Sequence, residues 1–199
     1  MSQLIHKITV GNKINGQLEK MLDGLPKAEF CYTDPPWGNG NLKYWKTINE
    51  KMTGQSIGQI DQEHLEKIVV RNIVNYVQHY AFIVYGIKQA DSLMQKLDLE
   101  KNVTNVQYIE KKYHNLENCV IAITLNNSPV IDWKNKLTYQ NGIKGLDVVC
   151  QEFAGKYTIC LDMFVGIGYY LKVLDKYGFT VYGNELNQAR LDKAFKKVM

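Results

Sequence analysis

The sequence has little of the chemistry that metal-binding and disulfide-stabilised proteins need. Its four cysteines, Cys31, Cys119, Cys150 and Cys160, show no Cys-x-x-Cys spacing. Neither a zinc site nor a disulfide framework is therefore indicated. Three of the four lie in apolar runs, where a buried free thiol is the usual state. The four histidines are scattered along the chain and are interpreted as surface or helix-end residues, so we expect no metal site.

Charge of one sign and long apolar runs are also scarce. The chain has 24 Lys plus Arg against 20 Asp plus Glu, a net charge of +4, which excludes a polycationic nucleic-acid binder and requires any basic patch to be local. No signal peptide or membrane span is recognised, and the expected compartment is the cytoplasm. With 45% hydrophobic residues in 199, one core and a single domain over residues 1–199 are expected.

Proline is rare as well, and two of the four prolines are adjacent in Asp34-Pro35-Pro36-Trp37. This motif follows the apolar run 28–33, which predicts a buried strand that ends in a rigid loop. The two prolines restrict the backbone and hold the Asp34 carboxylate and the Pro35 carbonyl in a nearly constant relation. Together they can accept both hydrogens of an amino group, with the aromatic face of Trp37 beside them. A stiff turn capped by a core tryptophan is the structural alternative.

A second segment, residues 158–185, predicts a strand, a glycine turn, a helix and a second strand. The turn runs from Asp162 to Gly168, and Glu185 ends the second strand. Glycines allow close backbone approach, the helix N-terminus favours a ligand carboxylate, and Glu185 can reach a ribose diol. Leu171 stands where the dinucleotide pattern Gly-x-Gly-x-x-Gly has its last glycine, which favours S-adenosylmethionine over a pyrophosphate-bearing cofactor. A ligand-free strand–helix turn is the alternative.

Together the two segments resemble the amino-group DNA methyltransferases, which use S-adenosylmethionine and carry an Asp-Pro-Pro-aromatic motif. The motif comes first and the glycine loop last, which is similar to the beta class, a circular arrangement of the common fold. An N-terminal block from Ile8 to Asn12, followed by a helix over 17–22, extends the resemblance. The chain departs from the family in two places. Asn12 stands where the family often has an acid after the glycine of the first block. In the loop, where the family more often reads Asp-Pro-Phe-x-Gly-x-Gly, Met163 and residues 165–168 replace the family's proline and small residues.

The resemblance implies methyl transfer to the N6 amino group of adenine in DNA, as in restriction-modification systems. The implied catalytic residues are Asp34, Pro35, Pro36 and Trp37. The implied cofactor-binding residues are Asn12, Asp34, Asp162, Phe164, Gly166, Gly168 and Glu185, with no metal.

The motif also bears on the alternatives for the substrate and the activity. Aspartate in the first motif position resembles adenine enzymes more than the Ser-Pro-Pro-aromatic pattern usual for the cytosine amino group. The absence of a Pro-Cys pair gives no support to the covalent route of cytosine-ring methyltransferases. Tryptophan in the fourth position also resembles RNA adenine methyltransferases, so RNA is the alternative substrate. A catalytically silent partner subunit that binds cofactor or nucleic acid is the remaining alternative.

The implied fold is α/β, a circularly arranged, Rossmann-like class I methyltransferase fold. It has a seven-stranded, mostly parallel sheet with helices on both faces. Hydrophobic periodicity supplies the remaining elements. They are a helix over 64–77, a strand over 80–85, a helix over 89–97, strands over 103–113 and 118–125, a helix over 145–155 and a terminal helix over 190–197.

Two long polar segments, 38–62 and 126–144, predict no regular structure and are candidate substrate-recognition loops. The first interleaves aromatic residues with lysines directly after the motif, a mixture suited to phosphates and an extruded base. The second includes Trp133 and several lysines. An ordinary cover over the cofactor pocket is the alternative. Neither is long enough for a target-recognition domain, so expected partners beyond DNA are a second copy of the chain or a separate specificity subunit.

Overall fold

The computed structural model describes residues 6–10, 17–53, 61–113, 116–138 and 142–198. Within these ranges the strands are β1 (Lys7–Val10), β2 (Ala28–Thr33), β3 (Val77–Gly86), β4 (Val103–Tyr113), β5 (Leu116–Leu125), β6 (Ile159–Asp162) and β7 (Thr180–Glu185). The helices are α1 (Gln17–Leu22), α2 (Asn39–Thr53), α3 (Gln62–Tyr76), α4 (Ile87–Asp98), α5 (Trp133–Leu137), α6 (Gly142–Phe153), α7 (Tyr169–Lys176) and α8 (Gln188–Phe195). None of the described helices is long and apolar enough to cross a membrane.

All seven strands form one sheet in the order β1-β7-β6-β2-β3-β5-β4. Five neighbouring strands, from β1 to β3 in this order, are parallel. Strand β5 pairs antiparallel with both β3 and β4. The predicted seven-stranded, mostly parallel sheet is thus confirmed, and every predicted strand is present with bounds shifted by at most a few residues.

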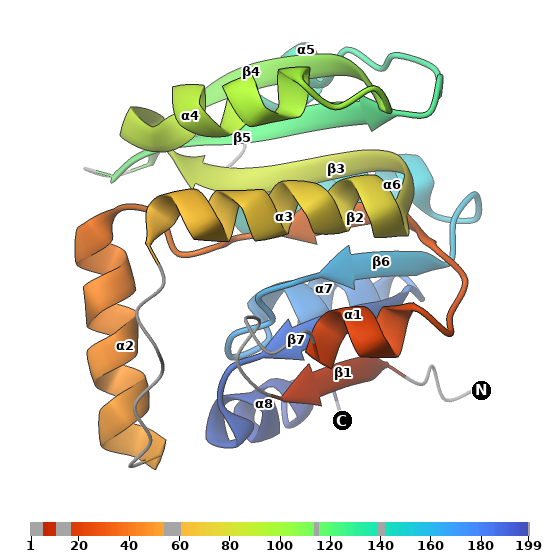
Figure 1. Ribbon diagram of the computed structural model, residues 1–199. Coiled ribbons are helices and arrows are strands. Elements are labelled where there is room, and N and C mark those ends of the chain that lie inside the picture. Colours follow the sequence, from red (N-terminus) through yellow and green to blue (C-terminus); the bar gives the residue numbers. More distant parts are fainter. Residues whose placement is uncertain (1–5, 11–16, 54–60, 114–115, 139–141, 199) are drawn as a thin grey trace.

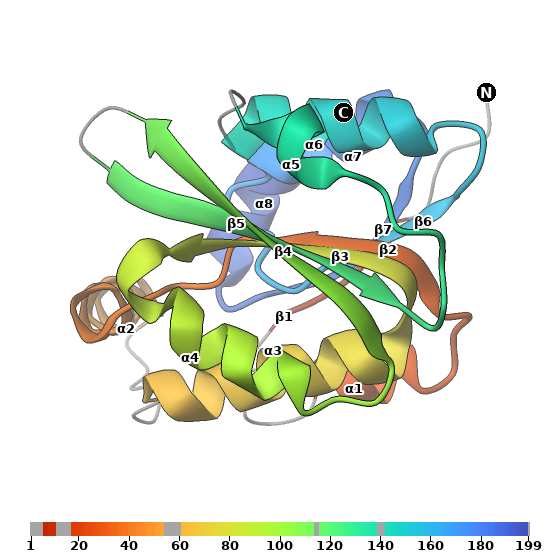
Figure 2. The ribbon, with the colours of Figure 1, turned by 90° about the horizontal axis from the view of Figure 1, so that it is seen from above.

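Helices cover both faces of the sheet, as predicted (Figures 1 and 2). Helices α1, α3 and α4 pack on one face, and α5, α6, α7 and α8 on the other. Successive residues of the central strand β2 alternate between the two cores, with Phe30 and Tyr32 in one and Cys31 in the other. Burial on both faces explains why this strand reads as a continuous apolar run.

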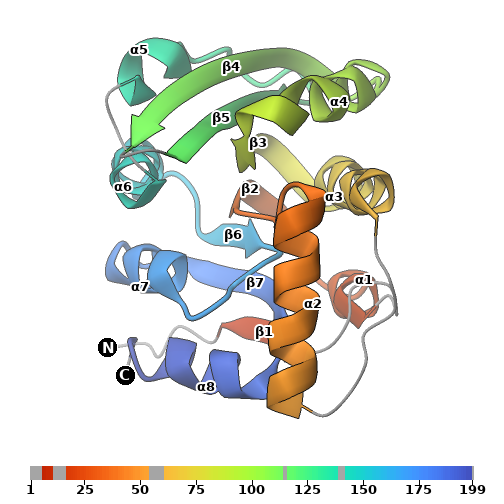
Figure 3. The ribbon, with the colours of Figure 1, turned by 90° about the vertical axis from the view of Figure 1, so that its left-hand side faces the viewer.

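The prediction of no regular structure over 38–62 is wrong, because 15 of these residues form helix α2. Gly38, Asn39, Gly40 and Asn41 are residue types that favour turns, but Gly38 precedes the helix and the others make its first turn. Figure 1 shows α2 beside the edge of the sheet where the parallel strands end, and Figure 3 shows it running from the level of β2 toward that of β1. The segment is therefore a helix at the carboxyl-terminal edge of the sheet rather than a loop.

The second predicted loop, 126–144, is also partly helical. It contains α5 and the start of α6, and the Asp132 side chain caps α5 by accepting the Asn135 N–H at 3.1 Å. Trp133 is fully buried, with its ring centroid 4.8 Å from that of Phe82 in an edge-on contact. Trp133 is thus a core residue and does not contact a nucleic acid from this position.

Candidate active site

The two sequence motifs meet at the carboxyl-terminal edge of the sheet. Strands β2 and β6 are parallel neighbours, with Cys31 paired to Leu161. Asp34 follows β2 directly, and Asp162 ends β6. The Thr33 hydroxyl donates to Asp162 Oδ1 at 3.2 Å, a buried hydrogen bond between residues 129 positions apart. The motif and the glycine loop are therefore parts of one site.

Asp34 is a carboxyl group with a strongly raised pKa at this edge. Burial, followed by the charge of Asp162, raises the pKa of Asp34 to about 7, while a hydrogen bond from the Trp37 side chain acts in the opposite direction. The Asp34 residue is nevertheless exposed by surface area. Water access weakens the effect of the surrounding protein, so about 7 marks the upper end of this pKa. A carboxylate with a pKa near neutrality suits proton transfer at physiological pH.

This pKa predicts a pH dependence for any activity that uses the Asp34 carboxylate. Asp34 is protonated below its raised pKa and ionised above it, and only the ionised carboxylate can take up a proton from a bound ligand. We expect kcat/KM for the cofactor, which reports the free enzyme, to rise about tenfold per pH unit below the pKa and to level off above about pH 7. A positively charged ligand beside Asp34 stabilises the carboxylate, so kcat should level off at a lower pH. A flat profile between pH 5 and 8 would contradict this role.

The Trp37 ring packs against Gly86 at the end of β3. A Cβ atom placed on Gly86 would lie 2.5 Å from Trp37 Cε3 and 2.6 Å from Gln89 Oε1. The six-membered part of the indole therefore rests against the Gly86 backbone, where no other residue leaves room. Trp37 is half-buried against the core that contains α3 and α4.

Substitution of Gly86 by alanine should therefore displace the Trp37 ring. We expect Gly86→Ala to lower kcat about tenfold with cofactor affinity unchanged, because overpacking forces about 1–3 kcal/mol of rearrangement onto the motif. Gly24→Ala is the matched control, since nothing lies within 4 Å of a Cβ there. Steady-state kinetics and calorimetry of cofactor binding measure both effects, and equal kcat values for the two variants would rule out this support.

The glycine loop after β6 has the backbone that its sequence predicts. Gly166 and Gly168 have φ values of +61° and +79°, in the left-handed region. Asp162 Oδ1 accepts the Phe164 N–H at 3.0 Å, and the Val165 N–H donates to the Asn184 carbonyl at 3.1 Å. These bonds join the loop to the ends of both β6 and β7.

Glu185 ends β7 next to this loop and is 6% exposed. Its carboxylate accepts the Gly166 N–H at 2.8 Å and the Asn187 N–H at 3.1 Å. Arg190 of α8 lies 3.4 Å from Glu185 Oε1. Burial raises the pKa of Glu185, and Arg190 together with the backbone N–H donors opposes that shift. In this structure Glu185 thus organises the loop.

Two tyrosines beside Asp34 were not identified from the sequence. Tyr32 donates its hydroxyl to the Gly142 carbonyl at 2.8 Å, and its ring meets that of Tyr170 edge-on at 5.1 Å. Burial raises the pKa of both phenols, and the charge of Asp34 raises it further. The position of Tyr170, two residues after Gly168, was the available signal. Asn12, the remaining predicted cofactor residue, lies outside the described residues.

Comparison with known proteins identifies the fold. No family model and no curated protein matches the sequence. Among solved structures, M1.HpyAVI matches with a TM-score of 0.65 at 12% identity, over 98% of this chain and 99% of that one. The chain has the α/β methyltransferase fold. TTHA0409 of Thermus thermophilus, a proposed DNA modification methylase, matches at 0.59 and 14% identity, over 98% and 96% of the chains.

Further matches extend this comparison. The cytosine-N4-specific PvuII DNA methyltransferase has a TM-score of 0.57 at 11% identity, over 96% of this chain and 86% of that one. M1.HpyAVI and TTHA0409 also match in structures that contain S-adenosylmethionine, with TM-scores of 0.64 and 0.56. Sequence identities this low establish the fold, and function must be argued from the site.

Proposed function

We propose that this protein transfers the methyl group of S-adenosylmethionine to the N6 amino group of adenine in DNA. The observation that carries the proposal is the junction of Asp34 with the Asp162–Gly168 loop, made by the Thr33–Asp162 hydrogen bond. Ligands of such sheets bind beyond the carboxyl ends of the strands, where both motifs lie. The fold shared with the PvuII DNA methyltransferase, and with M1.HpyAVI and TTHA0409 as solved with S-adenosylmethionine, supports the proposal.

The residues of the loop fit this cofactor. Gly166 and Gly168 allow the positive φ values that the turn of this loop requires, and both glycines pack against α8, Gly166 beside Arg190 and Gly168 beside Ala194. Glu185 accepts two N–H groups and keeps lone-pair capacity for ribose hydroxyls. Asp162 and Phe164 begin the loop, and Asn12 is proposed to bind the adenine. Bound there, the cofactor supplies a methyl group made electrophilic by a positively charged sulfur.

Asp34 and Pro35 would activate the amino group. The nitrogen of an exocyclic amine is a poor nucleophile, since its lone pair is delocalised into the ring. The Asp34 carboxylate and the Pro35 carbonyl each accept one hydrogen, which favours tetrahedral geometry and frees the lone pair. Asp34 then takes one hydrogen as a proton when the nitrogen is methylated and releases it to water. Trp37 would stack on the base, which must first leave the duplex at a cost of a few kcal/mol.

Helix α2 is the proposed nucleic-acid contact. It stands at the carboxyl-terminal edge of the sheet (Figures 1 and 3), the edge at which Asp34 follows β2. Lys43, Tyr44 and Lys51 are exposed on it. Lysines can neutralise phosphates, while an aromatic side chain can stack on a base or fill its vacated place. Substituting Lys43 and Lys51 should therefore weaken nucleic-acid binding more at low salt than at high salt.

The base and the polymer are decided by one experiment. The protein is expressed in a host without adenine methylation of its own, and modified bases are mapped by long-read sequencing. We expect N6-methyladenine at a short recurring sequence, and none with Asp34→Ala. N4-methylcytosine instead would correct the base, as the likeness to the PvuII enzyme allows. Unmodified DNA with methylated RNA would correct the polymer, and no methylation of either would favour a silent partner subunit.

A further inference from the structure

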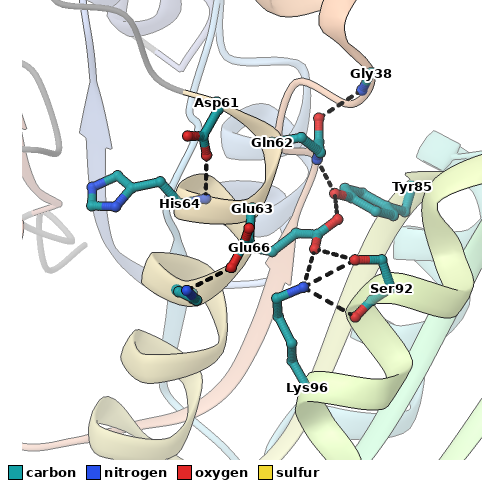
Figure 4. Close-up of polar contacts among 10 residues, drawn as sticks. Gly38, Asp61, Gln62, Glu63, His64, Glu66, Tyr85, Ser92 and Lys96 are labelled. Carbon is teal, nitrogen blue, oxygen red and sulfur yellow. Dashed lines mark hydrogen bonds and ion pairs between the residues drawn. The ribbon is translucent and has the colours of Figure 1, made fainter.

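A buried carboxylate outside the proposed catalytic groups connects three elements behind the motif. Glu66 of α3 is 1% exposed, and a glutamate is rarely buried to this degree unless it is paired. Figure 4 shows its partners: Tyr85 of β3 donates its hydroxyl to Oε1 at 2.8 Å, and Ser92 and Lys96 of α4 each donate to Oε2 at 2.7 Å. The carboxylate thus joins α3, β3 and α4.

The same network continues to the catalytic motif. Gln62 donates its amide Nε2 to the Tyr85 hydroxyl, and its Oε1 accepts the backbone N–H of Gly38 at 2.7 Å (Figure 4). Gly38 follows Trp37 directly and has a φ of +79°. An unbroken series of hydrogen bonds therefore runs from Lys96 to the turn after the motif. We call Gln62, Tyr85 and Glu66 the relay.

The relay and the motif also border one small space. Pro35 borders the same small space as Glu66, Tyr85 and Leu65. The residue after Tyr85 is Gly86, on which Trp37 rests. Both ends of the Pro35–Gly38 stretch are thereby supported by the end of β3 and the start of α3.

The Gln62–Gly38 bond has a second consequence for α2. Gly38 precedes this helix and Gln62 begins the next one, so the hydrogen bond joins the turn before α2 to the start of α3. The orientation of the motif and the base of α2 are fixed by the same side chain.

We propose that Gln62, Tyr85 and Glu66 are positioning residues that hold the Trp37–Gly38 turn, and through it Asp34 and the base of α2, in the geometry for methyl transfer. This inference rests on the proposed function, because methyl transfer is the reaction that the relay would affect. It assigns a role in catalysis to a buried network that touches neither the base nor the cofactor.

The test compares Gln62→Met with Glu63→Gln. Methionine keeps the length of glutamine but can neither accept the Gly38 N–H nor donate to Tyr85. Glu63 is the next residue of α3, and its partner is the exposed Lys67 at 2.7 Å, so Glu63→Gln leaves the relay intact. We expect Gln62→Met to lower kcat about 10- to 100-fold, with cofactor KM and dissociation constant unchanged, because small displacements of reacting groups have effects of this size. Glu63→Gln should match the wild type.

A readout independent of catalysis completes the test. Hydrogen exchange of the Gly38 amide, followed by NMR, should accelerate in Gln62→Met and in Tyr85→Phe and stay unchanged in Glu63→Gln. Wild-type kcat in both relay variants, or unchanged Gly38 exchange, would overturn the proposal. So would a fall in kcat no larger than that of Glu63→Gln. Absence of methyl transfer by the wild type would refute the proposed function, and Gly38 exchange would still decide whether the relay holds the turn.

Discussion

Replacement of Asp34 by asparagine is expected to reduce methyl transfer about 10³-fold, the range found when a positioned acid–base or charge-stabilising group is removed. Asparagine keeps the shape of the side chain but loses the charge and the capacity to take a proton. Cofactor affinity should change only a few-fold, since the loop from Asp162 to Glu185 remains intact. Asp98→Asn, at an exposed carboxylate on α4, is the control. Radiolabelled methyl transfer and calorimetry measure the two quantities.

The same substitution should stabilise the folded protein at alkaline pH. Folding raises the pKa of Asp34 from 3.8 to about 7, so the folded state binds this proton more tightly than the unfolded state does. Stability therefore falls as pH rises between these two values, and asparagine has no such loss. We expect Asp34→Asn to have the higher melting temperature at pH 8 and an equal one near pH 4. A lower melting temperature at pH 8 would show that the carboxylate is not under electrostatic stress.

Gly168→Ala is expected to have the largest effect on stability. A Cβ atom at Gly168 would lie 2.6 Å from both the Cα and the Cβ of Ala194, a buried residue of α8. Left-handed backbone costs about 1–2 kcal/mol for a residue other than glycine, and overpacking adds about 1–3 kcal/mol. Helix α8 must move, and with it Arg190, the ion-pair partner of Glu185. Cofactor binding should therefore weaken along with folding.

Gly178→Ala isolates the backbone part of this effect. Gly178 has a φ of +84°, and a Cβ there would meet nothing within 4 Å. Gly178→Ala should cost only about 1–2 kcal/mol, and Gly168→Ala about 3 kcal/mol or more. Denaturant unfolding gives both values. Equal losses of unfolding free energy in the two variants would mean that contact with α8 does not constrain the glycine loop.

Much of the fold follows from local sequence patterns. Strand β2 and helix α1 have the bounds that their patterns predict. For β2 the reason is that a strand buried on both faces reads as an apolar run. Helix α2 was not predicted, because the segment 38–62 is polar and opens with Gly38, Asn39, Gly40 and Asn41, which favour turns, although Leu42, Trp45, Ile48 and Met52 have helical spacing. The turn-forming residues are real, but they lie at the start of the helix and not throughout the segment.

Only the part of the site that depends on where the strands end could be predicted from the sequence. Asp34 follows one apolar strand and Asp162 ends another. Parallel strands end at the same edge of a sheet, so the meeting of the two residues could be expected. The contact of Trp37 with Gly86 depends on how two loops pack, which no local pattern encodes. The relay likewise needs α3, β3 and α4 in place before Glu66 finds its partners. A single glutamate beside the apolar residue Leu65 is in sequence indistinguishable from a solvated one.

The central claim is that Asp34 and the Asp162–Glu185 segment form one methyl-transfer site. Its most direct test is incubation of the purified protein with S-adenosylmethionine labelled in the methyl group and with unmethylated duplex DNA, followed by digestion to nucleosides and mass spectrometry. The account predicts labelled N6-methyldeoxyadenosine from the wild type and less than about one thousandth of it from Asp34→Asn, although both proteins bind the cofactor. Equal label from the two proteins would contradict it.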